Sequence, residues 1–248
     1  MKLNSRCAEI RTELSEGVFE ISIVRPAKKN ALSFAMLKEL VRLAKAAKAS
    51  RAVHAVILRG SEGVFSAGID RKDLSDPKRM PWAMYELLKP GQSLFQEACL
   101  IWRSVNKPVV AVLEGYVWGA GLQLALGADF RIAAKSLDMS FKEASLGLLP
   151  DMGASLTTAG LLPLDQRMEL IMTARRLSAF EAHQLGLITE ISDTPYERAL
   201  ELSKQLTHMD PVALASIKAV FGVDQPRLYA EKWHQVKLLA RKFGKSRS

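Results

Sequence analysis

Residues 109 to 127 combine a strand signal, a turn signal and a helix signal. The stretch begins with the apolar run Val109-Val110-Ala111-Val112-Leu113, passes through Gly119-Ala120-Gly121 and enters a second apolar run at Leu122. The pattern predicts a buried strand that ends in a small-residue turn opening a helix. The first N–H groups of a helix lack intrahelical acceptors and carry positive partial charge, so this turn presents hydrogen-bond donors. That geometry suits stabilisation of an oxyanion.

A similar turn lies about fifty residues upstream. The apolar run Val56-Ile57-Leu58 leads through Gly60 and Gly63 to the segment Phe65-Ser66-Ala67-Gly68-Ile69-Asp70. A carbonyl that becomes an enolate gathers negative charge on one oxygen, and donors from two turns can stabilise that charge together. The two turns therefore predict a site for enolate chemistry.

Composition limits the class of protein. At 248 residues, with 48% hydrophobic and 25% charged residues, we expect a globular protein with one main domain. No stretch approaches the roughly twenty apolar residues of a membrane span, and the N-terminus has no apolar signal core, so we expect a cytoplasmic protein without membrane contact. Cys7 and Cys99 show no partner pattern, which favours neither a disulfide framework nor a metal site.

The net charge of +9 is concentrated near the end of the chain, where residues 226 to 248 hold seven Lys and Arg against one Glu. Such a tail can be a solvated face, or it can bind a polyanionic small molecule, an acidic membrane surface or nucleic acid. Nucleic acid is the less favoured partner, since no helix-turn-helix, zinc-finger or aromatic-basic sheet signature is present.

Hydrophobic periodicity predicts alternating strands and helices, as in βαβ units. Ser33 is expected to cap a helix that runs to about Ser50, and Ser178 with Glu181 forms a capping-box signature for a helix ending near Gly186. Residues 72 to 104 are expected to be less regular before a helical stretch from Leu94. The predicted strands are 18 to 24, 53 to 58, 130 to 133, 137 to 141 and 188 to 191, and helices are expected from Tyr196 onward.

Several segments together resemble the crotonase (enoyl-CoA hydratase/isomerase) superfamily. The two turns match its signature segments, and the resemblance runs in the family's order over roughly residues 15 to 190. Its further parts are Arg25-Pro26 with Asn30-Ala31-Leu32, Asn106-Lys107-Pro108-Val109, Ala128-Asp129-Phe130-Arg131-Ile132-Ala133, Glu143 with Gly147 and Pro150, and Ala182-His183-Gln184-Leu185-Gly186-Leu187.

The resemblance implies an α/β fold, a spiral of repeated ββα units followed by a helical C-terminal region. Residues 1–190 would form the core with the coenzyme A and oxyanion site, and residues 191–248 the part that packs at trimer contacts and over the coenzyme. A homotrimer or a dimer of trimers is therefore expected. The family also implies that the segment around Trp82, Met84 and Tyr85 forms a wall of the acyl pocket, although ordinary packing explains these residues equally well.

The same resemblance places oxyanion donors at the backbone N–H groups of Ile69 and Ala120. Hydratases of the family hold two glutamates over the double bond, at the positions of Gln123 and Glu143 here. An amide cannot accept a proton at neutral pH, so Gln123 weakens a two-glutamate mechanism while leaving it able to position a group. Burial among neighbouring apolar residues would raise the pKa of Glu143 toward a range useful for proton exchange.

Asp151 lies eight residues after Glu143, where dienoyl-CoA isomerases of the family have an acid. The alternative is that Asp151 caps a helix over residues 152 to 159. Contacts to the coenzyme are expected, by resemblance, from Arg25, Lys29, Ala67, Gly68 and Asp70, with solvated surface charge as the alternative for the two bases. Coenzyme A would be part of the thioester substrate, and no separate cofactor or metal is expected.

These residues favour an acyl-CoA enzyme that isomerises the double bond of an enoyl thioester, with Glu143 as the acid and base. The second interpretation is hydration of a 2-enoyl thioester, and the third is a catalytically weak relative that binds acyl-CoA or nucleic acid. The scattered histidines and the absence of a nucleophile-elbow pattern give little support to covalent hydrolysis.

Overall fold

The computed structural model describes residues 2–221 and residue 236, and its framework is a six-stranded sheet. The strand order is β1-β2-β3-β4-β6-β9, in which β1 runs antiparallel to β2 and every other neighbouring pair is parallel. The strands are β1 (Ile10–Ser15), β2 (Val18–Ile23), β3 (Ala55–Gly60), β4 (Val109–Leu113), β6 (Phe130–Ala134) and β9 (Glu190–Ser192).

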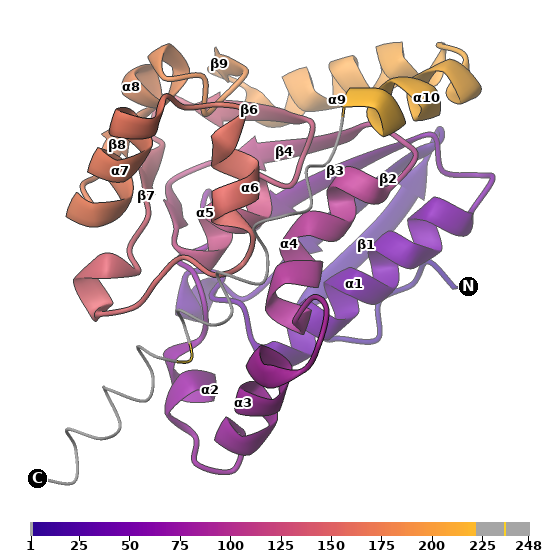
Figure 1. The fold of residues 1–248 in the computed structure, drawn as a ribbon. Coiled ribbons are helices and arrows are strands. Elements are labelled where there is room, and N and C mark those ends of the chain that lie inside the picture. Colours follow the sequence, from indigo (N-terminus) through magenta and orange to yellow (C-terminus); the bar gives the residue numbers. More distant parts are fainter. Residues whose placement is uncertain (1, 222–235, 237–248) are drawn as a thin grey trace, which may run out of the picture.

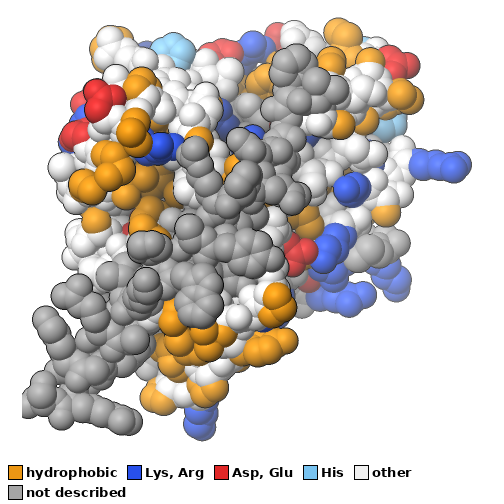
Figure 2. All heavy atoms as spheres, in the orientation of Figure 1, with side chains coloured by type: hydrophobic (Ala, Val, Ile, Leu, Met, Phe, Trp, Pro, Cys, Tyr) orange, Lys and Arg blue, Asp and Glu red, His pale blue; other side chains and the backbone are white. Residues whose placement is uncertain are grey.

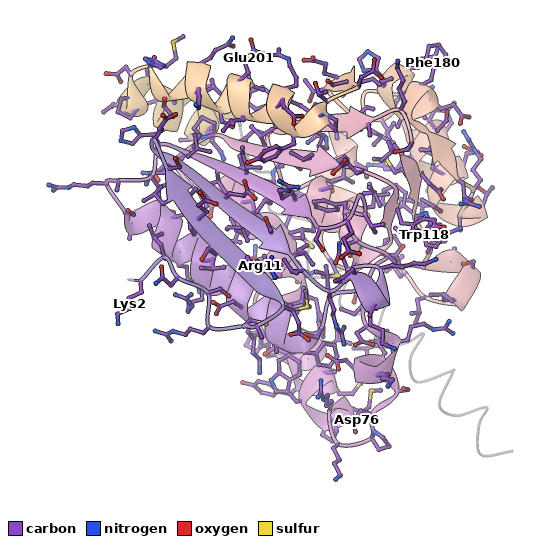
Figure 3. All side chains as sticks on the ribbon, turned by 180° about the vertical axis from the view of Figure 1, so that it is seen from behind. Lys2, Arg11, Asp76, Trp118, Phe180 and Glu201 are labelled. Atoms are coloured by element: carbon purple, nitrogen blue, oxygen red, sulfur yellow. The ribbon has the colours of Figure 1, made fainter. Side chains whose placement is uncertain are left out.

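Helices cover both faces of this sheet, which is why its central strands are almost continuously apolar. On one face α1 (Phe34–Ala49) and α4 (Leu94–Ser104) close the main core, and on the other α9 (Pro195–Thr207) lies along the strands (Figure 1). Ala199 of α9 packs in a small second core whose other members are Val18, Ile57, Val110, Val112 and Ile132 of the sheet. Seen from behind, Glu201 marks the outer side of α9 (Figure 3).

A second, three-stranded sheet contains β5 (Tyr116–Trp118), β7 (Asp138–Ser140) and β8 (Leu177–Ser178). Two isolated bridges extend it, one between Ser66 and Val117 and one between Leu32 and Ile69. Successive turns of the chain repeat a strand of the large sheet, a short extended segment of the small sheet and a helix. The predicted spiral of ββα units is confirmed.

The remaining helices complete these turns. They are α2 (Arg71–Ser75), α3 (Met80–Leu88), α5 (Ala120–Ala125), α6 (Ala154–Ala159), α7 (Leu164–Thr173), α8 (Ala179–Gln184), α10 (Pro211–Phe221) and the 3₁₀ turns η1 (Pro26–Lys28) and η2 (Ala144–Leu146). The predicted caps are confirmed: Ser33 Oγ accepts a hydrogen bond from the Met36 N–H, and Ser178 Oγ accepts one from the Glu181 N–H.

The structure corrects the prediction for residues 72 to 104, which are mostly helical because α2 and α3 precede α4. These two helices project from the body at the bottom of Figure 1, and hydrophobic side chains gather over this region in Figure 2. Tyr85 and Leu88 of α3 are among the exposed ones. Asp76 lies at the tip of the projection (Figure 3).

The C-terminal predictions are covered only in part. The helices α9 and α10 agree with the expected helical region, whereas the basic tail at residues 226 to 248 lies outside the described residues apart from Val236. The division at residue 190 stays a prediction, and it falls at the first residue of β9, a strand of the large sheet. Among the described residues, no helix is long and apolar enough to cross a membrane.

Candidate active site

The two predicted donor turns lie against each other. The Ser66 N–H donates to Tyr116 O (2.9 Å) and the Trp118 N–H donates to Ser66 O (3.0 Å), so the segment carrying Ile69 runs beside β5. Gly68 has φ +103°, and a Cβ atom on it would stand 3.0 Å from Trp118 O and 3.6 Å from Ala120 N. Only glycine allows this close approach without strain.

The amides of Ile69 and Ala120 are the donors that this contact brings together. In the part of the chain that the structure describes, neither N–H donates to another residue. Ala120 is the first residue of α5, where an N–H has no intrahelical acceptor. Two neighbouring N–H groups without acceptors can hold an oxyanion, so the geometry agrees with the predicted oxyanion hole, which stays a prediction.

The carboxylate of Glu143 lies at the same turn. A Cβ atom on Gly119, whose φ is +51°, would stand 3.2 Å from Glu143 Oε1. Although the residue as a whole is partly exposed, its Oε2 atom is buried and has no hydrogen-bond partner among the described residues. Burial raises the pKa of Glu143 to about 7, against the opposing effect of hydrogen bonds from its own N–H and from Gln123. A carboxyl with this pKa can both accept and return a proton near neutral pH.

Gln123 is fully buried on α5 and fixes one oxygen of that carboxylate. Its Nε2 donates to Glu143 Oε1 (2.7 Å), while its Oε1 accepts a hydrogen bond from the Met152 N–H (2.8 Å). Because the Met152 N–H is a donor, the amide oxygen must face it, and the amide nitrogen must face Glu143. Gln123 therefore orients Glu143 and leaves Oε2 as the oxygen available for chemistry.

Asp151 is half-buried and precedes Met152, so the loop that contacts Gln123 also carries this carboxyl group. The alternative role as a helix cap is wrong. The helix α6 begins at Ala154 rather than Met152, and its N-cap is Gly153, with φ +104° and no side-chain cap. A left-handed glycine, and not an aspartate, turns the chain into this helix.

Arg25 and Asp70 form an ion pair beneath the oxyanion segment. Arg25 Nη1 lies 2.6 Å from Asp70 Oδ2 and also donates to Ala31 O (3.1 Å). Asp70 caps α2 by accepting a hydrogen bond from the Lys72 N–H (2.9 Å). Although burial acts to raise it, the pKa of Asp70 is lowered by these contacts. Both residues thus support the loop structurally, whatever else they contact.

Lys29 and Ala67 lie at the outer edge of the site. Lys29 is exposed, its carbonyl oxygen accepts a hydrogen bond from the Ala67 N–H (2.9 Å), and its Nζ lies 4.4 Å from the centre of the Tyr116 ring. Trp118 lies two residues further along β5, and its ring centre is 4.3 Å from that of Tyr116. Of Arg25 and Lys29, the two basic residues expected to contact the coenzyme, Lys29 is therefore the accessible one.

One feature of the site has little sequence signal. The Met152 N–H sets the orientation of the Gln123 amide, and a backbone donor cannot be recognised from residue type.

Trp82 has two alternatives from the sequence, a place in the wall of the acyl pocket or ordinary packing. The centre of its ring lies 5.2 Å from that of Phe34 and 6.1 Å from that of Phe95. These contacts agree with packing between the first turns of α1 and α4.

Comparison with known proteins identifies the family. A family model described as enoyl-CoA hydratase/isomerase matches residues 13–246. The chain belongs to this family. It is 32% identical over 206 residues to the human enoyl-CoA hydratase domain-containing protein 2, mitochondrial, covering 80% of this chain and 68% of that protein. It is 36% identical over 169 residues to carnitinyl-CoA dehydratase of Salmonella typhi, covering 67% of this chain and 62% of the relative.

Solved structures of the family share the fold. An enoyl-CoA hydratase from Mycobacterium avium subsp. paratuberculosis K-10 superposes with a TM-score of 0.82 at 26% identity, covering 95% of each chain. An enoyl-CoA hydratase/isomerase from Mycobacterium paratuberculosis reaches a TM-score of 0.84 at 23% identity, with 93% of each chain covered. The predicted crotonase fold and the prediction of an enoyl-CoA hydratase/isomerase-family enzyme are confirmed. Within residues 2–221, no group of three or more His, Cys, Asp or Glu side chains could hold a metal ion.

Proposed function

We propose that this enzyme isomerises the double bond of an enoyl-CoA thioester, with Glu143 as its acid and base. One observation carries the proposal: the Glu143 carboxylate is held at Oε1 by the Gln123 amide, while its buried Oε2 has no partner among the described residues. A second carboxylate, which the resemblance associates with hydration, is replaced by that amide. Moving a double bond needs a proton removed and returned, and one carboxyl group with a pKa of about 7 can do both.

The N–H groups of Ile69 and Ala120 would bind the thioester carbonyl oxygen. Hydrogen bonding there makes the protons on the adjacent carbon more acidic, because the negative charge of the enolate is stabilised as it forms. Both donors are backbone groups held by the contact between the Gly68 segment and β5, so they are positioned before the substrate binds.

The proton transfer then balances within the site. Glu143 Oε2 takes a proton from C2 of a 3-enoyl thioester, and the electron pair spreads over C2 to C4 and the carbonyl oxygen. The protonated Glu143 returns the same proton to C4. The double bond moves from C3–C4 to C2–C3, and the enzyme regains its starting state.

Coenzyme A would reach the site along the outer edge formed by Lys29 and Ala67, beside the buried Gly68. Lys29 is the better candidate for a phosphate contact, because its ammonium group is exposed and the Arg25 guanidinium is engaged by Asp70. Arg25 and Asp70 would then act by holding the loop. Coenzyme A enters as part of the substrate, and the expected homotrimer or dimer of trimers stays a prediction.

Hydration of a 2-enoyl thioester is the second candidate, and it is supported by the name of one relative, a carnitinyl-CoA dehydratase. In that case Asp151, on the loop beside Gln123, would have to assist Glu143 with the second proton. The two reactions differ in product, since hydration adds one water and isomerisation leaves the mass unchanged.

The deciding experiment supplies purified enzyme with 3-enoyl-CoA and, separately, 2-enoyl-CoA of several chain lengths, and identifies products by mass and absorbance. Glu143→Gln is compared with Glu201→Gln, a change at an exposed position on α9. The proposal expects a shifted double bond with the wild type and Glu201→Gln, and a loss of at least about a hundredfold with Glu143→Gln. Addition of water without isomerisation would replace the proposal by hydration, and activity retained in Glu143→Gln would refute the role of Glu143.

A further inference from the structure

Three hydrogen bonds attach the segment carrying Ile69 to the start of α1. The Leu32 N–H donates to Gly68 O (2.7 Å), and the Asp70 N–H donates to Leu32 O (2.8 Å). The third bond comes from a side chain: the Phe34 N–H donates to Asp73 Oδ2 (2.7 Å). Ile69 therefore lies in a short stretch that is held on both sides by contacts to residues 32 to 34.

The contact at Asp73 is buried and charged. Asp73 is 5% exposed and Phe34 is 4% exposed. Phe34 is the first residue of α1, so its N–H has no acceptor within the helix, and a carboxylate at this end of a helix is favoured by the helix dipole. The other oxygen of Asp73 is ion-paired with Arg79, which precedes α3. No other described side chain takes the Phe34 N–H, since Ser33 Oγ accepts from Met36.

We propose that Asp73 is a positioning residue for the oxyanion hole. Asp73 lies in α2, and its carboxylate accepts a hydrogen bond from Phe34, the first residue of α1. Leu32 is bonded to Gly68 and Asp70, on either side of Ile69. These contacts together close a loop of chain that contains Ile69. That closure holds the Ile69 N–H in the direction in which it meets the thioester oxygen, so its effect on catalysis rests on the proposed function. Misplacing a reacting or stabilising group by about 1 Å can slow an enzyme about a hundredfold.

Glu86 provides a matched control. It is 7% exposed, and its Oε2 accepts a hydrogen bond from the N–H of Leu94 (2.6 Å), the first residue of α4. The contact repeats the chemistry at Asp73, a buried carboxylate on the first N–H of a long helix. This contact lies outside the segment carrying Ile69, so its removal tests for general damage to the projection formed by α2 and α3.

The test compares Asp73→Ala, Asp73→Asn and Glu86→Ala by amide hydrogen exchange in the free enzyme. Asp73→Ala is expected to speed exchange of the Leu32 and Asp70 N–H groups at least tenfold. Asp73→Asn keeps an acceptor oxygen and should change those rates less than threefold, as should Glu86→Ala. If Asp73 only caps a helix, Asp73→Ala will instead affect the Leu37 N–H, which donates to Ser33 O, and leave Asp70 unchanged, which overturns the inference.

Kinetics supply the second readout, on 3-enoyl-CoA. Loss of position at one oxyanion donor should lower kcat about tenfold in Asp73→Ala, with KM changed less than threefold, because the interaction strengthens mainly in the transition state. Asp73→Asn should recover kcat to within threefold of the wild type. A change confined to KM would overturn the inference. A wild-type enzyme that turns over no enoyl-CoA would count against the proposed function alone, since the exchange rates still decide the role of Asp73.

Discussion

Replacing Gln123 by methionine should shift the pH dependence of the enzyme. The Gln123 Nε2 donates one buried hydrogen bond of 2.7 Å to the Glu143 carboxylate, and this bond lowers the pKa of Glu143 from where burial alone would place it. A hydrogen bond to a charged group is worth about 1.5–3 kcal/mol, and one pKa unit corresponds to about 1.4 kcal/mol. Methionine has a similar length and no donor, so it should raise the pKa of Glu143 by about 1–2 units.

The assay is kcat/KM for 3-enoyl-CoA between pH 5.5 and 10, which reports the pKa of the base in the free enzyme. With a wild-type pKa of about 7, half of Glu143 is ionised at pH 7, and Gln123→Met should reduce that fraction to about one tenth to one hundredth. Activity at pH 7 should fall about 5- to 50-fold, with recovery on the alkaline plateau. An acidic limb that stays in place or moves to lower pH would refute the assigned role of Gln123.

Two further results are expected. The pKa of Glu143 in the folded protein is about 7, above its ordinary value of 4.5, so the protein loses stability as pH rises from 4.5 to 7. Glu143→Gln removes this ionisation and should raise the unfolding free energy at pH 8 by about 3 kcal/mol at most. A lower Tm than wild type at pH 8 would contradict this expectation. Arg25→Met should lower the unfolding free energy at pH 7 by about 2 kcal/mol. This loss should shrink as pH falls from the ordinary aspartate value of 3.8 through the lower pKa that Asp70 has in the folded protein. KM for the thioester should change less than threefold, and a KM rise as large as that of Lys29→Met would show a direct coenzyme contact instead.

Local sequence patterns predicted much of the fold. The helix capped by Ser33, the capping box at Ser178 and the strand at residues 109 to 113 all lie where the patterns place them. These elements follow from contacts within a few residues, such as a hydroxyl on an N–H three positions away. Pro77, Pro81 and Pro90 interrupt the hydrophobic periodicity of residues 72 to 104, so the pattern predicts a less regular segment. The structure shows instead that a proline can start a helix, since Pro81 lies in the first turn of α3.

Several of the candidate site residues that the resemblance implies lie close together in the structure, and their roles stay predictions. Glu143, Gln123 and the turn at Ala120 meet, and the segment of Gly68 and Ile69 lies beside them. What the sequence left open was the role of each group. Asp151 could be an acid or a cap, and only the position of Gly153 at the start of α6 removed the second alternative.

Near neighbours along the chain encode the helices capped by Ser33 and Ser178, the apolar strand at residues 109 to 113 and the small-residue turn that follows it. The helices α2 and α3 do not follow from the local pattern. The role of each polar atom at the site depends on contacts between distant parts of the folded chain. Gln123 donates to Glu143 because Met152, far away in sequence, occupies its oxygen, and Arg25 is held by Asp70 because two loops meet. The pKa of Glu143 is raised because packing removes its carboxylate from water. Desolvation and hydrogen-bond direction are properties of a folded interior, and no local pattern encodes them.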